Sequence, residues 1–231
     1  MITNSIMTIR EEHQKSKAYW DARARPWSTS SASVSYLSQF YEAWNDRLEN
    51  PLLDIGCGSG KFLYRAVDGG RTDVYGLDIS PKLIEISRDR LRLLLGEEVN
   101  RRIITLDMLD FSDHFDRGFF RSLIFSGVLQ QTVYSGARPT LQQIAHVSAP
   151  GAMMYFSTRS ISTPPPDGTP VEGERGTYRL PDDVVKTYFR RADIEELIDG
   201  LFEIVELDEK PQTEKISGAE IANWEGILRR L

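Results

Sequence analysis

The sequence has a single cysteine, no long apolar run and no excess of positive charge. Of its 231 residues only Cys57 carries a thiol, which excludes an internal disulfide and favours a reducing compartment, the cytoplasm. No stretch of roughly 18 consecutive apolar residues suggests a membrane span, and residues 1–14 lack the apolar core of a signal peptide. The formal net charge of −6 argues against nucleic acid as a partner. We therefore expect neither membrane nor nucleic acid to be a partner of this protein.

Histidine is also scarce, and this limits the chemistry to be expected. The three histidines, His13, His114 and His146, lie far apart in the sequence. Because no partner is visible for any of them, each is expected to have a structural or solvent role. The sequence therefore predicts no metal site and identifies no catalytic residue.

What the sequence does contain is a regular alternation of short apolar segments and amphipathic ones. Segments of strand length occur at 51–55, 73–78, 102–106, 119–125 and 152–157, and helical segments start at 61 and cover 80–96 and 140–147. Ser80 suits the N-cap of the second helix, Pro81 its first turn and Gly96 its end. This order predicts a Rossmann-like α/β fold, with a mostly parallel sheet and helices on both faces.

The chain after the fifth strand departs from this alternation. Residues 162–177 hold Pro164, Pro165, Pro166 and Pro170 together with several glycines, and they predict a mobile loop. A helix is expected over 180–199, ended by Gly200.

The C-terminal part predicts two more strands, at 202–207 and 221–228. A short polar segment joins them, so they are expected to form an antiparallel hairpin at the sheet edge. The whole chain, residues 1–231, is therefore expected to be one domain with a seven-stranded sheet. Residues 1–17 are expected to be a flexible N-terminal segment.

Three glycines at alternate positions follow the first strand, in the segment Asp54-Ile55-Gly56-Cys57-Gly58-Ser59-Gly60. Glycine lets the backbone approach a ligand closely, and the free N–H groups that open the next helix favour an anionic group. The nicotinamide fingerprint G-x-G-x-x-G fails, because Lys61 stands where the third glycine belongs. A phosphate-binding P-loop also fails, because Gly60-Lys61-Phe62 lacks the metal-binding hydroxyl.

An acidic residue followed by G-x-G-x-G resembles motif I of the class I methyltransferases that use S-adenosylmethionine (SAM). The resemblance implies that Gly56, Gly58 and Gly60 contact the methionine part of SAM, and that Asp54 steadies the loop and the ligand's amino group. Asp78 ends the next strand, 18 residues after Gly60, where a carboxylate can accept hydrogen bonds from both ribose hydroxyls. An aspartate that caps the following helix is the alternative.

Two further segments resemble the family: the residues after the third strand and a segment near the N-terminus. It assigns the Asp107 carboxylate to the adenine amino group and the Met108 backbone to the ring edge, although Asp could also mark a solvated turn here. The segment from Ala18 to Ala24 resembles the Tyr-Trp-Asp-x-Arg-Ala start of many family members, which covers the cofactor. An amphipathic helix packed on the sheet is the alternative. The cofactor contacts implied are Tyr19, Trp20, Arg23, Asp54, Gly56, Cys57, Gly58, Gly60, Asp78, Ile79, Asp107, Met108 and Ser126.

The end of the fourth strand, from Phe125 to Gln131, resembles the motif IV region, which lies between cofactor and acceptor. It contains no Asp-Pro-Pro-Tyr or Asn-Pro-Pro-Tyr segment, which further disfavours nucleobases as acceptors. Gln130 and Gln131 replace the histidines of many small-molecule relatives, and glutamine takes up no proton near neutral pH. The acceptor-pocket candidates at the carboxyl ends of the strands are Gln130, Tyr134, Arg159 and Tyr178.

The sequence thus predicts a SAM-dependent methyltransferase that acts on an oxygen or nitrogen of a small molecule by in-line displacement and releases S-adenosylhomocysteine (SAH). Such transfer depends mainly on proximity and orientation, so the missing base is compatible with activity. Three alternatives remain: a peptide or protein methyltransferase, a SAM-binding partner protein without catalysis and, remotely, a nicotinamide oxidoreductase.

Overall fold

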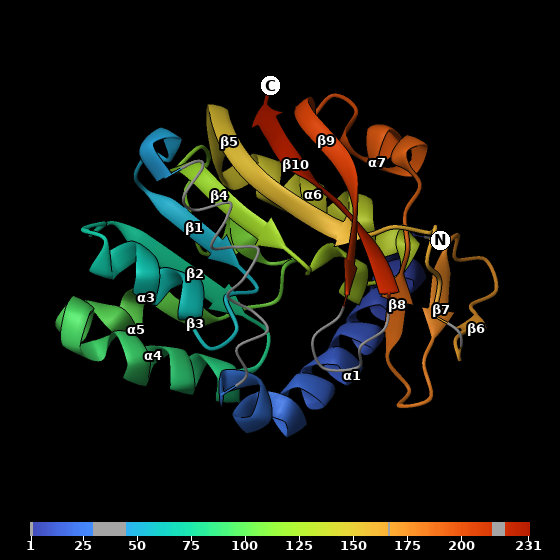
Figure 1. Ribbon diagram of the computed structural model, residues 1–231, viewed down its shortest axis with the longest axis horizontal. Coiled ribbons are helices and arrows are strands. Elements are labelled where there is room, and N and C mark those ends of the chain that lie inside the picture. The colour runs from blue at the N-terminus through green and yellow to red at the C-terminus, as the bar shows by residue number, and fades with distance from the viewer. Residues whose placement is uncertain (1, 30–44, 166, 214–219) are drawn as a thin grey trace.

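The computed structural model describes residues 2–29, 45–165, 167–213 and 220–231. Among these, seven strands form one sheet in the order β3-β2-β1-β4-β5-β10-β9 (Figure 1). Their bounds are β1 Leu52–Ile55, β2 Val74–Asp78, β3 Ile103–Thr105, β4 Phe120–Ser126, β5 Ser148–Arg159, β9 Phe202–Thr213 and β10 Glu220–Arg230. The first five strands pair in parallel, whereas β10 pairs antiparallel with both β5 and β9. The predicted α/β fold with a mostly parallel sheet and a C-terminal hairpin is confirmed.

Helices cover both faces of this sheet. They are α1 (Ile2–Thr29), α3 (Lys61–Asp68), α4 (Pro81–Leu95), α5 (Val99–Arg102), α6 (Tyr134–Val147) and α7 (Arg191–Ile198), with short 3-10 turns η1 (Asn45–Arg47), η2 (Gly96–Glu98), η3 (Phe111–Asp113) and η4 (Leu129–Gln131). Apolar residues of α6 and α7 join one buried cluster with the sheet, and those of α3, α4 and α5 join another. The sheet is therefore the middle layer of three.

The predicted start and end of α4 are both observed. The Ser80 side chain accepts a hydrogen bond from the backbone N–H of Leu83 at 3.1 Å, Pro81 opens the helix, and Gly96 follows its last residue with a positive φ of 59°. These residues lie at or directly beside the ends of the helix, so its bounds can be predicted from the local sequence.

Strand β1 lies between β2 and β4, so the chain leaves it toward one side of the sheet and later returns on the other side. In open α/β sheets such a switch point creates a crevice at the carboxyl ends of the strands. Helix α1 crosses the edge formed by the carboxyl ends of the strands (Figure 1). Its side chains contact residues that follow β2, β3 and β4. The glycine loop after β1 therefore lies at the crevice that α1 borders.

The N-terminal segment forms a helix. Residues 2–17, expected to be flexible, belong to the 28-residue helix α1. His13 and Glu12 of this helix are buried, and they bind partners about a hundred or more residues away. Tertiary contacts therefore hold this helix, and a local reading of the sequence cannot detect them.

The elements within residues 162–177 and 180–199 differ from those expected, and the mobility of the first segment stays a prediction. The first segment, expected to be a mobile loop, contributes β6 (Thr169–Pro170), and its last residue starts β7 (Thr177–Arg179). The second, expected to be one helix, contains β8 (Val185–Thr187) followed by α7. The strands β6, β7 and β8 form a separate antiparallel sheet, termed the cap sheet below. Residue 166, which falls in the expected loop, lies outside the described residues.

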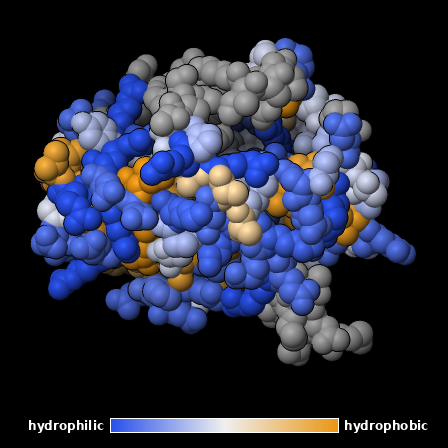
Figure 2. Space-filling view, turned by 90° about the horizontal axis from the view of Figure 1, so that it is seen from below, coloured by the Kyte–Doolittle hydropathy of each residue, from blue (hydrophilic) through white to orange (hydrophobic). Residues whose placement is uncertain are grey.

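The surface shows no dominant apolar region on the face drawn in Figure 2, which is mostly hydrophilic with separate apolar patches. Leu93 is the most exposed of the large apolar side chains named as exposed, at 96%. Among the described residues no helix has both the length and the apolar character that crossing a bilayer requires.

Candidate cofactor and acceptor site

The glycine loop after β1 has a backbone shape that requires glycine. Gly56, Gly58 and Gly60 have φ values of 70°, 55° and 70°, in the left-handed region that side chains disfavour. A Cβ at Gly56 would lie 2.3 Å from Val128 Cγ2, and one at Gly60 would lie 2.2 Å from Ser87 Oγ. The loop therefore needs glycine both for its conformation and for its close packing.

Asp78, at the end of β2, closes this loop from the neighbouring strand. One carboxylate oxygen accepts the backbone N–H of Gly58 at 3.0 Å, and the other accepts the N–H of Ser80 at 2.8 Å. Burial raises the pKa of Asp78 to about 6, although both hydrogen bonds favour its ionised form. Ser80, rather than Asp78, caps α4, so the alternative role for Asp78 is not observed. A carboxylate has about four acceptor positions, so two remain for ribose hydroxyls.

Asp54, on β1 below the loop, is a buried carboxylate without a hydrogen-bond donor among the described residues. Its side chain belongs to a residue that is only 5% exposed. Burial, followed by the nearby Asp78, raises the pKa of Asp54 well above its usual range. A buried carboxylate without a donor is costly, so this position favours a cationic partner. The amino group of a methionine moiety is such a partner.

Cys57 lies within the loop but does not resemble a reactive thiol. It is buried, and burial together with Asp54 and Asp78 raises the pKa of its thiol well above the usual range. It packs closely on β2, because a Cβ at Gly76 would lie 3.0 Å from its Sγ, and its contact with the cofactor stays a prediction.

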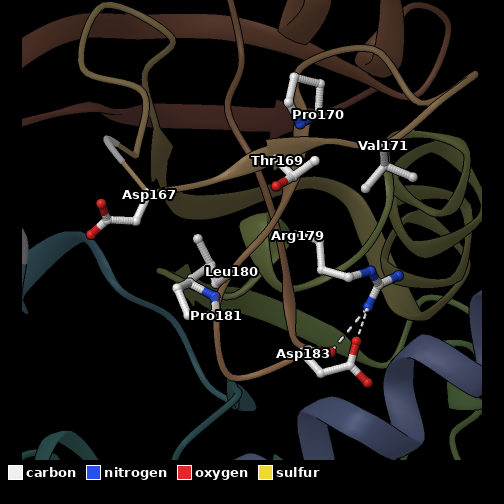
Figure 3. Close-up of a pocket in the computed structure, with 8 residues that line it drawn as sticks. All are labelled: Asp167, Thr169, Pro170, Val171, Arg179, Leu180, Pro181 and Asp183. Carbon is white, nitrogen blue, oxygen red and sulfur yellow. Dashed lines mark hydrogen bonds and ion pairs between the residues drawn. The ribbon is translucent and has the colours of Figure 1, made fainter.

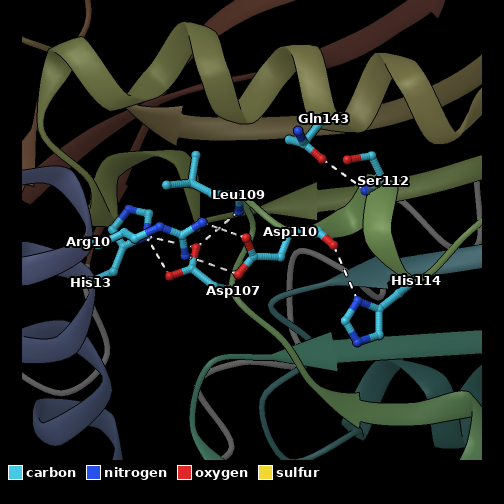
Figure 4. Close-up of polar contacts among 8 residues, drawn as sticks. All are labelled: Arg10, His13, Asp107, Leu109, Asp110, Ser112, His114 and Gln143. Carbon is cyan, nitrogen blue, oxygen red and sulfur yellow. Dashed lines mark hydrogen bonds and ion pairs between the residues drawn. The ribbon is translucent and has the colours of Figure 1, made fainter. Parts of the chain in front are cut away.

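Asp107, after β3, meets α1 instead of facing solvent (Figure 4). Nδ1 of His13 lies 2.9 and 3.0 Å from its two carboxylate oxygens, and the backbone N–H of Leu109 donates to Oδ1 at 3.0 Å. Although burial opposes ionisation, the hydrogen bonds from His13 and Leu109 and the charge of Arg10 lower the pKa of Asp107. The neighbouring Met108 is half-buried against the apolar cluster under α6. The carboxylate stays ionised and has acceptor positions left.

Side chains of α1 reach both the cofactor edge and the cap sheet. Asp21 accepts the hydroxyl of Ser80 at 2.5 Å, next to Asp78. The guanidinium of Arg23 stacks 3.6 Å from the Tyr19 ring and pairs with Asp182 at 3.1 Å. Arg23 thus already has an acidic partner, and its pairing with a methionine carboxylate stays a prediction.

Tyr19 and Trp20 are half-buried and meet edge to face, with ring centroids 5.1 Å apart. Ile79 is half-buried between Asp78 and Ser80. At the end of β4 the hydroxyl of Ser126 lies 2.8 Å from that of Ser157. Ile79 and Ser126 lie at the carboxyl ends of β2 and β4, where the crevice lies. The contacts of Tyr19, Trp20, Ile79 and Ser126 with the cofactor stay predictions.

The four acceptor candidates differ in their contacts within the protein. Gln130 is buried and accepts a hydrogen bond from Thr158 at 3.2 Å, while Arg159 donates to Asn223 at 3.4 Å. The Tyr134 hydroxyl accepts from Arg175, and Tyr178 packs edge to face on Tyr188, with centroids 5.8 Å apart. Each of these side chains already has a protein partner.

A cavity of about 600 Å³ lies instead at the cap sheet (Figure 3). It is lined by Asp167, Thr169, Pro170, Val171, Arg179, Leu180, Pro181 and Asp183. Glu12 of α1 accepts two hydrogen bonds from the Arg179 guanidinium, at 2.7 and 3.1 Å, and Lys15 pairs with Asp183 at 3.1 Å. The wall of this cavity is therefore fixed to α1. No local signal in the sequence predicts this cavity, because its residues were expected to form a loop and a helix.

The residues present fit SAM. A Cβ at Gly56 or Gly60 would overlap a neighbouring side chain, Asp54 is a buried carboxylate without a donor in the described part of the chain, and Asp78 has acceptor positions left beside it. Sequence reasoning found these three but missed Asp21 and His13, which lie on a helix that only tertiary contacts bring here. No group of three or more metal-binding side chains occurs in the part of the chain that the structure describes.

Comparison with known proteins agrees with this geometry. Residues 52–151 match the family model described as a methyltransferase domain. A SAM-dependent methyltransferase from Methanosarcina mazei has a TM-score of 0.69 at 21% identity, over 83% of this chain and 98% of that chain. The 1,6-didemethyltoxoflavin-N1-methyltransferase of Burkholderia thailandensis, solved with 1,6-didemethyltoxoflavin and SAH, has a TM-score of 0.69 at 15% identity, over 96% and 90%. At such identities the structural likeness shows a shared fold.

A curated relative matches only a short segment. The ribosomal protein L11 methyltransferase of Laribacter hongkongensis is 50% identical over 38 residues, which are 16% of this chain and 13% of that protein. The segment is too short to assign its acceptor to this chain.

Proposed function

We propose that this chain, a member of the class I SAM-dependent methyltransferases, transfers a methyl group to an oxygen or nitrogen of a small molecule. The observation that carries the proposal is the loop at 56–60, which Asp78 closes over the Asp54 carboxylate, a group without a donor among the described residues. This arrangement suits a ligand with one cationic end and two neighbouring hydroxyls. SAM has both, in its methionine and its ribose.

The cap-sheet cavity is the proposed acceptor site. Its position on α1 supports this, because Lys15 contacts the cavity wall and Asp21 contacts Ser80, two residues after β2. Lys15 and Asp21 are six residues apart, which is about 9 Å along a helix. A cavity of about 600 Å³ falls in the range that small ligands occupy. The Burkholderia thailandensis structure, with a small heterocycle bound on the same fold, is compatible with such an acceptor.

The contribution of this chain to catalysis is binding and orientation. When bound, SAM supplies a methyl group on a sulfonium, which needs no further activation. Asp54 would hold the amino group and Asp78 the ribose, so that the methyl carbon has a fixed place. Holding two reactants in line can lower a barrier by about 7–11 kcal/mol, which makes a general base dispensable. Gln130 is buried at the end of β4, where it accepts a hydrogen bond from Thr158.

We place the reaction in the cytoplasm. The single thiol of the chain is buried and unpaired, which fits a reducing compartment.

Labelled SAM tests the proposal. The protein is incubated with the labelled cofactor in two preparations of the same lysate, one complete and one freed of macromolecules. We expect methylated small molecules and SAH from both. Label that appears only in protein would support the peptide or protein alternative. SAM binding with no SAH from either preparation would favour a partner protein without catalysis, and either result would contradict the proposal.

A further inference from the structure

His13 of α1 is buried among polar groups that lie far from it in the sequence. It is 1% exposed, and both of its ring nitrogens have partners. Nδ1 faces the Asp107 carboxylate, and Nε2 lies 2.9 Å from Oγ1 of Thr132, which is itself fully buried. One imidazole therefore links the end of β3, where Figure 4 shows it beside Asp107, to the turn after β4.

The hydrogen bonds continue from Thr132 into the cap sheet. The Thr187 hydroxyl donates to the carbonyl oxygen of Thr132 at 2.5 Å and lies 2.8 Å from the hydroxyl of Thr177. The hydroxyl of Thr177 in turn accepts the backbone N–H of Tyr134 at 3.1 Å. Thr177 and Thr187 are buried, so the chain of hydrogen bonds is shielded from water along its length.

The available hydrogens fit this chain in only one way. Thr187 uses its hydrogen on the Thr132 carbonyl, so Thr177 must donate to Thr187. The Thr132 hydroxyl has no other acceptor among the described residues, so it donates to Nε2 of His13. Nδ1 then donates its hydrogen to the Asp107 carboxylate. Every buried donor in the chain is satisfied by this assignment.

We propose that His13 is a positioning residue: it fixes the Asp107 carboxylate so that this group accepts a hydrogen bond from the 6-amino group of the cofactor's adenine. This proposal rests on the proposed function, because it requires SAM in the crevice. Asp107 is held by His13 and Leu109 and still has acceptor positions left. Because His13 belongs to α1, adenine recognition depends on that helix being docked.

The test compares two ligands that differ at one group. SAH carries the 6-amino group, whereas S-inosylhomocysteine carries a carbonyl oxygen there and cannot donate to Asp107. Dissociation constants for both are measured on the wild type, His13→Phe and His13→Asn. The amide nitrogen of asparagine stands where Nδ1 stands and can donate to Asp107. His114→Phe, at an exposed histidine near Asp110, is the matched control.

We expect the wild type and His114→Phe to prefer SAH by at least tenfold. His13→Phe should lose most of this preference, and His13→Asn should keep most of it. Equal weakening of both ligands in His13→Phe would assign His13 a purely structural role and overturn the inference, as would an unchanged preference. Failure of the wild type to bind SAH would instead overturn the proposed function.

Thr132→Val provides a second variant in case His13→Phe does not fold. It removes only the hydroxyl that holds Nε2, at nearly constant volume. We expect it to lower the preference for SAH about threefold with little loss of folded protein, and a full wild-type preference would contradict the chain of hydrogen bonds.

Discussion

The two carboxylates near the glycine loop, Asp78 and Asp54, differ in their hydrogen-bond donors. Asp78 has two backbone donors and a pKa of about 6. Asp54 has no donor among the described residues, and burial and the nearby Asp78 raise its pKa well above the usual range. A buried charge is tolerated only when it is paired. The loop is therefore built for a ligand that brings hydroxyl donors and a positive charge.

Asp78 should make cofactor binding depend on pH. Ribose hydroxyls bind its ionised form, so below about pH 6 the affinity for SAH should fall by about tenfold per pH unit. Titration calorimetry between pH 5 and 8 measures this, and Asp78→Asn should bind weakly without the break near pH 6. A wild-type affinity that is constant across this range would contradict the role of Asp78.

The same carboxyl affects stability in the absence of ligand, with a defined sign. Its pKa rises from 3.8 to about 6 on folding, so between these values the folded state holds a proton that the unfolded state has lost. Its contribution to stability is therefore present below pH 3.8 and is lost as pH rises through about 6.

Gly60 and Gly200 allow a matched test of close packing in the loop. Their φ values are 70° and 69°, but a Cβ at Gly60 would meet Ser87 Oγ at 2.2 Å, whereas nothing lies within 4 Å at Gly200. Gly200→Ala should cost about 1 kcal/mol of unfolding free energy from backbone strain alone. Gly60→Ala should cost about 1–3 kcal/mol more from overpacking. Urea unfolding measures both, and equal losses would show that the loop is not tightly packed.

At the scale of elements, α1 is the helix that joins the cofactor edge to the cap sheet. It reaches Ser80 through Asp21, Asp107 through His13, and Arg179 through Glu12. Polar contacts account for much of its attachment, and their geometry is specific. The cap sheet and the cofactor site are therefore expected to respond to changes in the same helix.

The ion pair between Glu12 and Arg179 should contribute more to the free energy of unfolding than an exposed ion pair does. Glu12 is buried and accepts two hydrogen bonds from the guanidinium. Glu12→Gln should lower the unfolding free energy by about 2 kcal/mol. Glu195→Gln, in the exposed pair with Arg191, is the control and should change it by less than about 1 kcal/mol. Equal effects in urea unfolding would mean that the Glu12 contact does not hold α1.

The elements that could be predicted from the sequence are those with local signals. Strand β1, its glycine loop and α4 with Ser80 as N-cap follow from residues next to one another. His13 and Asp107 are 94 residues apart, so their contact had no such signal. The short strands β7 and β8 depend on partners such as Thr132 and were assigned wrongly for the same reason.

For the whole molecule, the ligand and the fold should stabilise each other. A ligand present at 100 times its dissociation constant adds about 2.7 kcal/mol to the unfolding free energy. For a domain of this size we expect SAH at that ratio to raise the melting temperature by roughly 5–10 °C. Thermal scans with and without SAH measure this shift, and its absence in the wild type would contradict specific binding.

Calorimetric titration of SAH into the wild type, Gly58→Arg and Gly173→Arg tests the central claim most directly. Both glycines have positive φ, at 55° and 77°, but Gly58 donates to Asp78 in the loop whereas Gly173 lies in open space. The account predicts one SAH per chain for the wild type and for Gly173→Arg, and none for Gly58→Arg. Undiminished binding by Gly58→Arg would show that the cofactor does not lie against the loop at 56–60.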